Sequence, residues 1–237
     1  MIIGIPKEIK ESEHRVGMTP SGAQTLIQNG HDVYVQNSAG QGSGHSDDDY
    51  LSVGAKLLKN IEEVYDISEM IIKVKEPLKS EYLLIKEGQI IYTYLHLAAA
   101  KDLTLGLMKT KSICIAYETV TDDSGRLPLL APMSAVAGRM SVQAGAHALE
   151  KNQKGRGLLI GGAPGVDPAN VVILGGGVVG ENAAIIATGM RAKVHVVDKS
   201  QERLNELTDI LGCLLYTSPS PRDSWASRMP ACAWKKK

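Results

Sequence analysis

The feature that most constrains the fold is a glycine-rich turn between two short apolar segments. Val171–Leu174 has the β-branched, apolar character of a buried parallel strand, and the turn Gly175–Gly180 follows it directly. A helical pattern runs from Val178 to about Met190, and a second strand pattern then ends at Asp198. The order strand, glycine turn, helix, strand and acid predicts a β-α-β unit that binds a dinucleotide.

Three glycines of this turn have separate expected roles. Gly175 permits the tight turn, Gly177 lets the backbone approach a pyrophosphate at the helix N-terminus, and Gly180 allows the helix to pack closely on the strand. Asp198 is placed to accept hydrogen bonds from an adenosine ribose. Its carboxylate favours NAD over NADP, because it would repel a 2′-phosphate, although Lys199 and Arg203 nearby weaken that preference.

Composition and charge exclude several classes of partner. The 26 basic and 26 acidic residues of the 237-residue chain balance, so there is no electrostatic reason to expect nucleic acid or an anionic membrane as a partner. No stretch approaches the roughly 20 apolar residues of a membrane span. The N-terminus lacks the pattern of a signal peptide, so a cytoplasmic protein is expected. The three cysteines form no metal-type pair, and no metal site is predicted.

Alternating strand and helix patterns predict an α/β fold with two Rossmann-like domains, each with a parallel sheet, the second one incomplete. We expect a substrate domain over residues 1–128 and a linking helix with the first half of an NAD-binding domain over 129–212. In the first domain the expected strands are Ile2–Ile5, Asp32–Gln36, Met70–Val74, Gln89–Thr93 and Ser112–Ala116. One expected helix follows the cap Thr19 and stops at Asn29, and another runs from about Lys101 to Met108. One long helix is expected over residues 131–152.

The last part of the chain, residues 213–237, differs from the rest. It loses helix and strand periodicity, contains both tryptophans, and ends in three lysines. It resembles the translation of sequencing-adaptor read-through, so we expect a non-native or disordered tail and a native chain that breaks off near Gly212.

Three polar residues follow three separate strand patterns of the first domain. Arg15 can bind a carboxylate with its guanidinium fork, Lys75 can bind a carboxylate or polarise a carbonyl, and His96 can exchange protons near neutral pH. Each of the three alone would more often be structural. Because the carboxyl ends of parallel strands meet at one edge of an open sheet, we expect these side chains to lie around one crevice.

Together these motifs resemble the alanine dehydrogenases. The resemblance covers residues 1 to about 212 and rests on several segments in addition to the glycine turn: Gly4–Glu8, Arg15–Val16, Lys73–Pro77, Leu95–Ala98, Ala116–Val120, Leu127–Ser134 and Val136–Arg139. It implies reversible oxidative deamination of L-alanine to pyruvate and ammonia with NAD. It also implies a homo-oligomer, usually a hexamer.

The resemblance also assigns roles to residues. Arg15 and Lys75 would bind the substrate carboxylate and carbonyl, and His96 would be the proton donor and acceptor. Ser134 and Asp198 would contact NAD, with Val178 of the glycine turn beside it. Arg203 stands where the family usually has lysine.

Two further features of the family have no counterpart in this chain: a second catalytic residue, an aspartate late in the NAD domain, and a C-terminal segment that completes the first domain. The 237 residues alone are therefore expected to be poorly folded or inactive. Two alternatives remain open. One is the NAD-binding alpha subunit of proton-translocating transhydrogenase, which lacks the histidine of the Leu95–Ala98 segment. The other is a non-catalytic dinucleotide-binding fragment.

Overall fold

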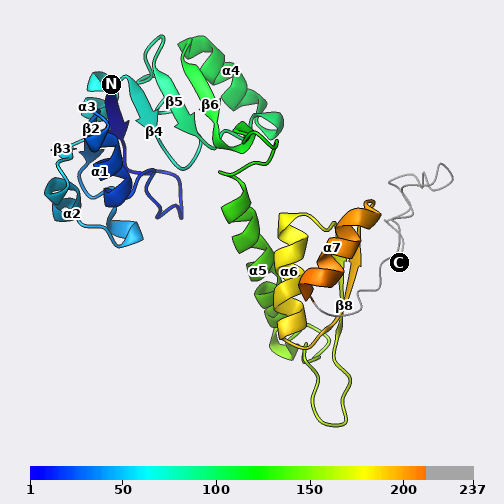
Figure 1. Cartoon of the computed structure of the whole chain (residues 1–237). Coiled ribbons are helices and arrows are strands. Elements are labelled where there is room, and N and C mark those ends of the chain that lie inside the picture. Colours follow the sequence, from blue (N-terminus) through cyan, green and yellow to red (C-terminus); the bar gives the residue numbers. More distant parts are fainter. Residues whose placement is uncertain (212–237) are drawn as a thin grey trace. The chain divides into compact units, whose positions relative to one another are not determined.

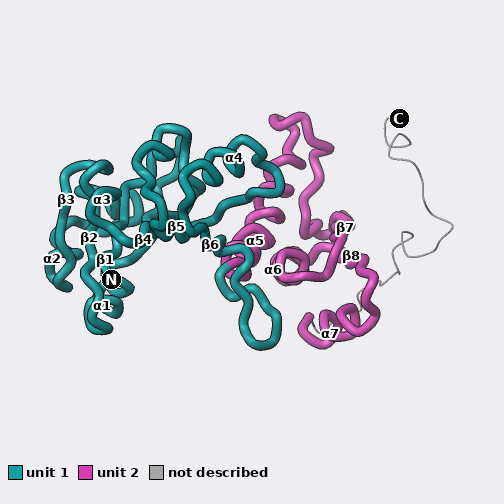
Figure 2. Tube along the Cα trace, turned by 90° about the horizontal axis from the view of Figure 1, so that it is seen from above, with its two compact units in different colours: residues 1–129 teal, residues 130–237 magenta. Residues whose placement is uncertain are grey.

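The structure is a computed structural model that describes residues 1–211. The chain divides after Leu129 into two compact units, which Figure 2 draws in different colours. The expected tail over 213–237 lies outside the described residues.

Unit 1 is built on a six-stranded, all-parallel sheet with the order β3-β2-β1-β4-β5-β6 (Figure 1). The strands are β1 (Ile2–Ile5), β2 (Asp32–Gln36), β3 (Lys56–Leu58), β4 (Met70–Ile72), β5 (Ile90–Thr93) and β6 (Ile113–Ala116). The prediction of an α/β fold with a parallel sheet is confirmed. The strand order reverses between β1 and β4, which places a crevice at the carboxyl ends of these two strands.

The helices of unit 1 begin where the sequence provides caps. They are α1 (Pro20–Gln28), α2 (Asp47–Ser52), α3 (Ile61–Ile67) and α4 (Lys101–Thr110), with short 3-10 turns η1 (Gln41–Ser43), η2 (Leu97–Ala99) and η3 (Tyr117–Thr119). Thr19 caps α1 by accepting a hydrogen bond of 3.2 Å from the amide of Gly22, and Pro20 occupies the first helical position. The start expected for this helix is confirmed.

The core of unit 1 is aliphatic with buried tyrosines, since the chain contains no phenylalanine. One cluster includes Ile5, Val33 and Val35, and another includes Ile71 and Ile91. The strand ends are therefore anchored by packed side chains just before the loops that carry the candidate site residues.

Unit 2 contains the β-α-β unit that the glycine turn predicts. Its elements are α5 (Ala131–Ala148), η4 (Lys151–Gln153), β7 (Asn170–Leu174), α6 (Val178–Gly189), β8 (Lys193–Val197) and α7 (Gln201–Leu211), and β7 pairs with β8 in parallel. The sheet of this unit has two strands among the residues that the structure describes. None of the described helices is long and apolar enough to cross a membrane.

Helix α5 ends at Ala148 and does not continue to residue 152. The reason is local. Gly157 donates to the carbonyl of Leu149 at 2.7 Å and Gly155 donates to that of Glu150 at 2.9 Å, so loop amides satisfy carbonyls that a longer helix would use. Within α5, Gly138 allows α6 to approach, because a Cβ there would lie 2.2 Å from the carbonyl oxygen of Val179.

Candidate active site

The glycine turn in unit 2 has a positive φ at Gly175 and a close approach of the backbone at Gly180. Gly175 has φ of +97°, a conformation that side chains disfavour. A Cβ on Gly180 would lie 1.9 Å from the carbonyl oxygen of Gly175, so close packing requires glycine there. A Cβ on Gly177 would meet nothing within 4 Å, which leaves open space beside the first residue of α6. This is the space in which an anion can approach the helix N-terminus.

Asp198 follows β8 and is connected to the turn by hydrogen bonds. Its Oδ1 accepts from the amide of Ser200 at 2.8 Å, and its Oδ2 accepts from the amide of Gly176 at 2.6 Å. These two bonds lower the pKa of the Asp198 carboxyl, the one from Ser200 contributing most. The carboxylate therefore fixes the glycine turn against the end of β8, in addition to any role toward a ligand.

Arg203 belongs to α7 and contacts the same glycine turn. Its Nε donates to the carbonyl oxygen of Gly176 at 2.7 Å, and its guanidinium also pairs with Glu206 at 2.7 Å and with Glu181. Since a guanidinium forms planar, multi-donor contacts that an ammonium cannot reproduce, this arrangement depends on arginine.

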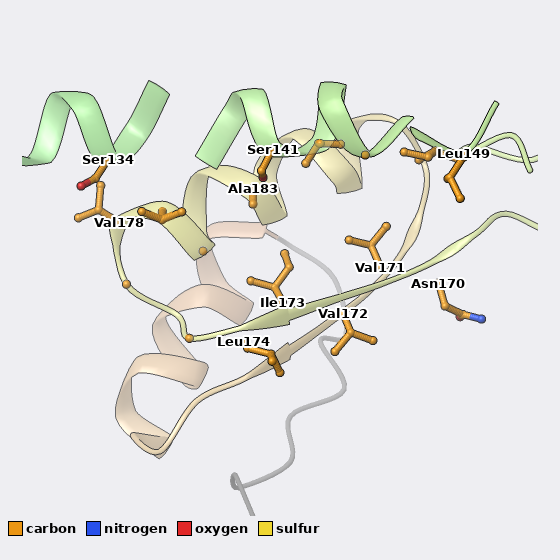
Figure 3. A pocket seen from close by; sticks show the side chains of 17 residues that line it. Ser134, Ser141, Leu149, Asn170, Val171, Val172, Ile173, Leu174, Val178 and Ala183 are labelled. Carbon is orange, nitrogen blue, oxygen red and sulfur yellow. The ribbon is translucent and has the colours of Figure 1, made fainter. Parts of the chain in front are cut away.

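A cavity of about 740 Å³ adjoins the glycine turn (Figure 3). Five of the expected cofactor residues line it: Ser134, Gly175, Gly177, Val178 and Gly180. Ser134 and Val178 lie toward one end in the view of Figure 3, and Asn170 lies toward the other. Asp198 and Arg203 are not among the lining residues. The cavity wall is mostly apolar and includes Ile173 and Leu174 of β7.

In unit 1, Glu8 spans the crevice where the strand order reverses. This residue follows β1, is buried, and accepts from the amides of Val74 at 2.6 Å and Lys75 at 3.2 Å. Its other oxygen lies 3.3 Å from Nζ of Lys73, which also lies 2.8 Å from an oxygen of Glu81. Neither approach has hydrogen-bond geometry, so charge holds Lys73 between the two carboxylates.

Arg15 is held by a two-bond pair with Glu13. Its Nε donates to Oε1 at 2.8 Å and its Nη2 donates to Oε2 at 2.6 Å. The hydrogen bonds from Arg15 lower the pKa of Glu13 to about 2, and the charge of Lys75 contributes further. Both cations therefore act on one carboxylate, and the pairing fixes the orientation of the Arg15 guanidinium.

A cavity of about 440 Å³ lies beside Arg15 and is walled partly by aromatic rings. Tyr92, Tyr94 and Tyr117 line it, and the ring of Tyr117 lies edge-on to Tyr92 at 4.4 Å and to Tyr94 at 4.9 Å. Burial raises the pKa of the Tyr117 phenol. A cation beside neutral, amphipathic rings suits a small organic anion with an apolar part.

His96 follows β5 and adopts a left-handed conformation, with φ of 52° and ψ of 35°. Its amide donates to Oε1 of Glu118 at 2.6 Å, and the amide of Leu95 donates to both oxygens of the same carboxylate. The imidazole stacks on Tyr94 with the ring centres 6.1 Å apart. His96 is thereby connected to the cavity through Tyr94.

The three expected substrate residues lie at the same sheet edge, but they do not all line the same cavity. Arg15 lines the cavity, whereas Lys75 follows the lining residue Val74 and His96 stacks on a lining tyrosine. Sequence reasoning missed Glu8, Glu13 and Glu118, the carboxylates that hold these residues. The available signal was their position, since Glu8 and Glu118 each come just after a strand.

Comparisons with known proteins agree on one family. The family model described as "Alanine dehydrogenase/PNT, N-terminal domain" matches residues 4–137, and the model for its C-terminal domain matches residues 141–230. An alanine dehydrogenase from Methanococcus maripaludis is 56% identical over 212 residues, which is 90% of this chain and 57% of the relative. One from Halomonas elongata is 56% identical over 88% of this chain and 56% of the relative. The chain thus spans little more than half the length of these relatives.

Solved structures give the same picture of the fold. A structure titled L-alanine dehydrogenase has a TM-score of 0.84 and 50% identity, covering 92% of this chain and 60% of that one. A transhydrogenase from Sinorhizobium meliloti has a TM-score of 0.76 at 22% identity, covering 92% of this chain and 64% of that one. The second likeness is one of fold alone.

Proposed function

The chain belongs to the alanine dehydrogenase/PNT family, and we propose that it supplies the substrate and cofactor sides of an NAD-dependent L-alanine dehydrogenase. The reaction is the reversible oxidative deamination of L-alanine to pyruvate and ammonia. The observation that carries the proposal is the fixed guanidinium of Arg15 at a small, tyrosine-lined cavity. Such a cavity suits a carboxylate substrate with a short apolar side chain.

Each substrate residue has a role that follows from its chemistry. Arg15, oriented by Glu13, binds the substrate carboxylate through its planar donors. Lys75 stabilises negative charge on the carbonyl oxygen that forms as ammonia departs. His96, exposed at the same sheet edge, takes and returns the protons that water addition and ammonia release require.

The residues present fit a dinucleotide. The open space beside Gly177 faces the N-terminus of α6, which favours a pyrophosphate, and Ser134 lies on the same cavity. Asp198 follows β8 and accepts a hydrogen bond from the glycine turn, a position in which a carboxylate can bind a ribose. NAD, when bound, supplies a hydride acceptor for the alanine Cα. Cytoplasmic location and a homo-hexamer belong to the same proposal.

The test joins residues 1–211 to the part of the Methanococcus maripaludis relative that follows the matched region. The identity of 56% over 212 residues makes such a chimera suitable. L-Alanine-dependent formation of NADH, followed by its ultraviolet absorbance, is the expected result. In this chimera His96→Ala should lower turnover by roughly 10²-fold or more while NADH binding persists.

The matched control is His147→Ala, which removes an exposed histidine of α5 that pairs with Glu150 and lines neither cavity. Its turnover should equal that of the parent. Near-normal turnover in the His96→Ala chimera would refute the role of His96. NADH binding without any alanine-dependent reaction would favour the transhydrogenase-type or non-catalytic alternatives.

A further inference from the structure

The direction of the His96 side chain is set by its backbone. Its φ of 52° lies in the left-handed region, which few residues other than glycine occupy. The direction of the Cα–Cβ bond follows from this φ and from the orientation of the peptide group between Leu95 and His96. A contact that holds this peptide group therefore helps to place the imidazole.

Glu118 provides that hold from a neighbouring strand end. It lies in η3, after β6, whereas His96 follows β5. Its Oε1 accepts from the amides of His96 at 2.6 Å and Leu95 at 3.1 Å, and its Oε2 lies 3.2 Å from the amide of Leu95. Hydrogen bonds from amides to an ionised carboxylate are stronger than those to neutral acceptors.

The two bonded amides fix the peptide group that precedes His96. The N–H groups of Leu95 and His96 both lie on the N-terminal side of the His96 Cα, and Oε1 of Glu118 accepts from both. Their convergence on one carboxylate therefore holds the peptide plane from which the His96 side chain departs.

The position of the imidazole depends on the same arrangement. The ring stacks on Tyr94 with an angle of 11° between planes, and Tyr94 lines the cavity beside Arg15. The Tyr94 hydroxyl donates to the carbonyl oxygen of Leu129, so this partner is itself fixed. If the peptide group before His96 rotated, the direction of the His96 Cβ would change and the ring would leave Tyr94.

We propose that Glu118 is a positioning residue, which fixes the peptide group between Leu95 and His96 and so keeps the imidazole on Tyr94, beside the substrate cavity. The proposal rests on the proposed function for the part that His96 plays in catalysis. Glu118 acts through the backbone amides of Leu95 and His96, so what it must supply is an oxygen acceptor at the position of Oε1.

Three variants separate this role from others. Glu118→Ala removes the acceptor, whereas Glu118→Gln removes the charge but keeps one oxygen, and Oε1 alone accepts from both amides. Glu87→Ala is the matched control, because Glu87 is an exposed carboxylate of unit 1 that pairs with Lys111. If Glu118→Ala fails to fold, Glu118→Asp replaces it in both measurements, because the shorter side chain moves the acceptor away from the amides by one methylene.

The first measurement is amide hydrogen exchange on the chimera, followed by mass spectrometry of the peptides that contain Leu95 and His96. Exchange at His96 and Leu95 should be roughly tenfold faster in Glu118→Ala, and within about threefold of the parent in Glu118→Gln and Glu87→Ala. Unchanged exchange in Glu118→Ala would overturn the proposal. This measurement requires no catalytic activity.

The second measurement is steady-state kinetics on the chimera. Glu118→Ala should lower kcat roughly tenfold or more with little change in KM for alanine, and Glu118→Gln should recover most of the loss. A Glu118→Gln variant as slow as Glu118→Ala would overturn the proposal, because charge and not the acceptor would then matter. If the parent chimera lacks alanine-dependent turnover, the proposed function fails, while amide exchange still decides whether Glu118 holds His96.

Discussion

Glu8 accepts a hydrogen bond of 2.6 Å from the backbone amide of Val74, although 66 positions separate the two residues in the chain. The bond crosses from the end of β1 to the end of β4, the two strands at which the sheet order reverses. Lys75 follows Val74 directly, and its backbone amide donates to the same oxygen of Glu8. The position of Lys75 therefore depends on a residue from the other side of the crevice.

Replacing Lys73 by methionine should destabilise unit 1 strongly. Lys73 is 1% exposed and lies between Glu8 and Glu81, so its removal leaves two buried carboxylates without a cation. Breaking a buried ion pair on one side costs about 3–5 kcal/mol in the free energy of unfolding. Urea unfolding followed by circular dichroism measures the change. Lys79→Met, at a lysine that is 81% exposed, is the control and should cost less than about 0.5 kcal/mol.

Replacing Gly177 by alanine should separate dinucleotide binding from folding. A Cβ there meets nothing within 4 Å, so unit 2 should fold normally. The same Cβ would occupy the space through which a pyrophosphate approaches α6, so the affinity for NADH should fall roughly tenfold or more. NADH fluorescence titration measures affinity, and thermal unfolding measures stability.

Two other glycines are controls for this prediction. Gly180→Ala places a Cβ 1.9 Å from the carbonyl oxygen of Gly175 and should lower stability as well as binding. Gly189→Ala lies in the same helix with nothing within 4 Å and should leave both unchanged or raise stability slightly. Full NADH affinity in Gly177→Ala would contradict the proposed cofactor site.

Asp198→Asn should weaken the preference for NADH over NADPH. The substitution removes the negative charge that would repel a 2′-phosphate, and the ratio of the two dissociation constants should shift roughly tenfold toward NADPH. Stability should also fall, because both carboxylate oxygens accept backbone hydrogen bonds and an amide can replace only one. Asp209→Asn, at an exposed aspartate of α7, is the matched control. An unchanged ratio would argue against a ribose contact.

The pair between Glu13 and Arg15 should make unit 1 sensitive to acid. Hydrogen bonds from Arg15 lower the pKa of Glu13 in the folded protein from the usual 4.5 to about 2. A lowered folded-state pKa stabilises the protein above the unfolded-state value, and this stabilisation is lost as the pH falls from about 4.5 toward 2. Urea unfolding at a series of pH values measures this. The parent should have a higher free energy of unfolding than Glu13→Gln at neutral pH, and the two values should converge in acid. A constant difference at all pH values would contradict this.

The strand pattern predicted the main framework because the residues themselves carry the signal. Runs such as Ile2–Ile5 and Val171–Leu174 are apolar and β-branched, and their burial in a parallel sheet follows directly. The strand β3 (Lys56–Leu58) was not predicted. It has three residues, one of them charged, and it exists because β2 offers a free edge with which it pairs.

The local shape of the candidate site was less accessible to sequence reasoning. The peptide group before His96 is hydrogen-bonded to Glu118, which lies 22 residues later in the chain. Likewise, the orientation of Lys75 depends on Glu8, which lies 67 residues earlier. No local propensity encodes such contacts, since they form only after strands distant in sequence are side by side. The sequence places these residues at strand ends, and the tertiary contacts orient them.

The order of strands in unit 1 also has a consequence for the newly made chain. β1 leaves the ribosome first but lies between β2 and β4, so its second edge stays uncovered until residues 70–72 have been made. At about 5–20 residues per second this interval lasts seconds. The amide of His96 must then wait for Glu118, the last of these partners to emerge. The sheet edge that carries His96 is therefore completed after its neighbouring strands, and a chain interrupted before residue 118 would bury its core without the contact between His96 and Glu118.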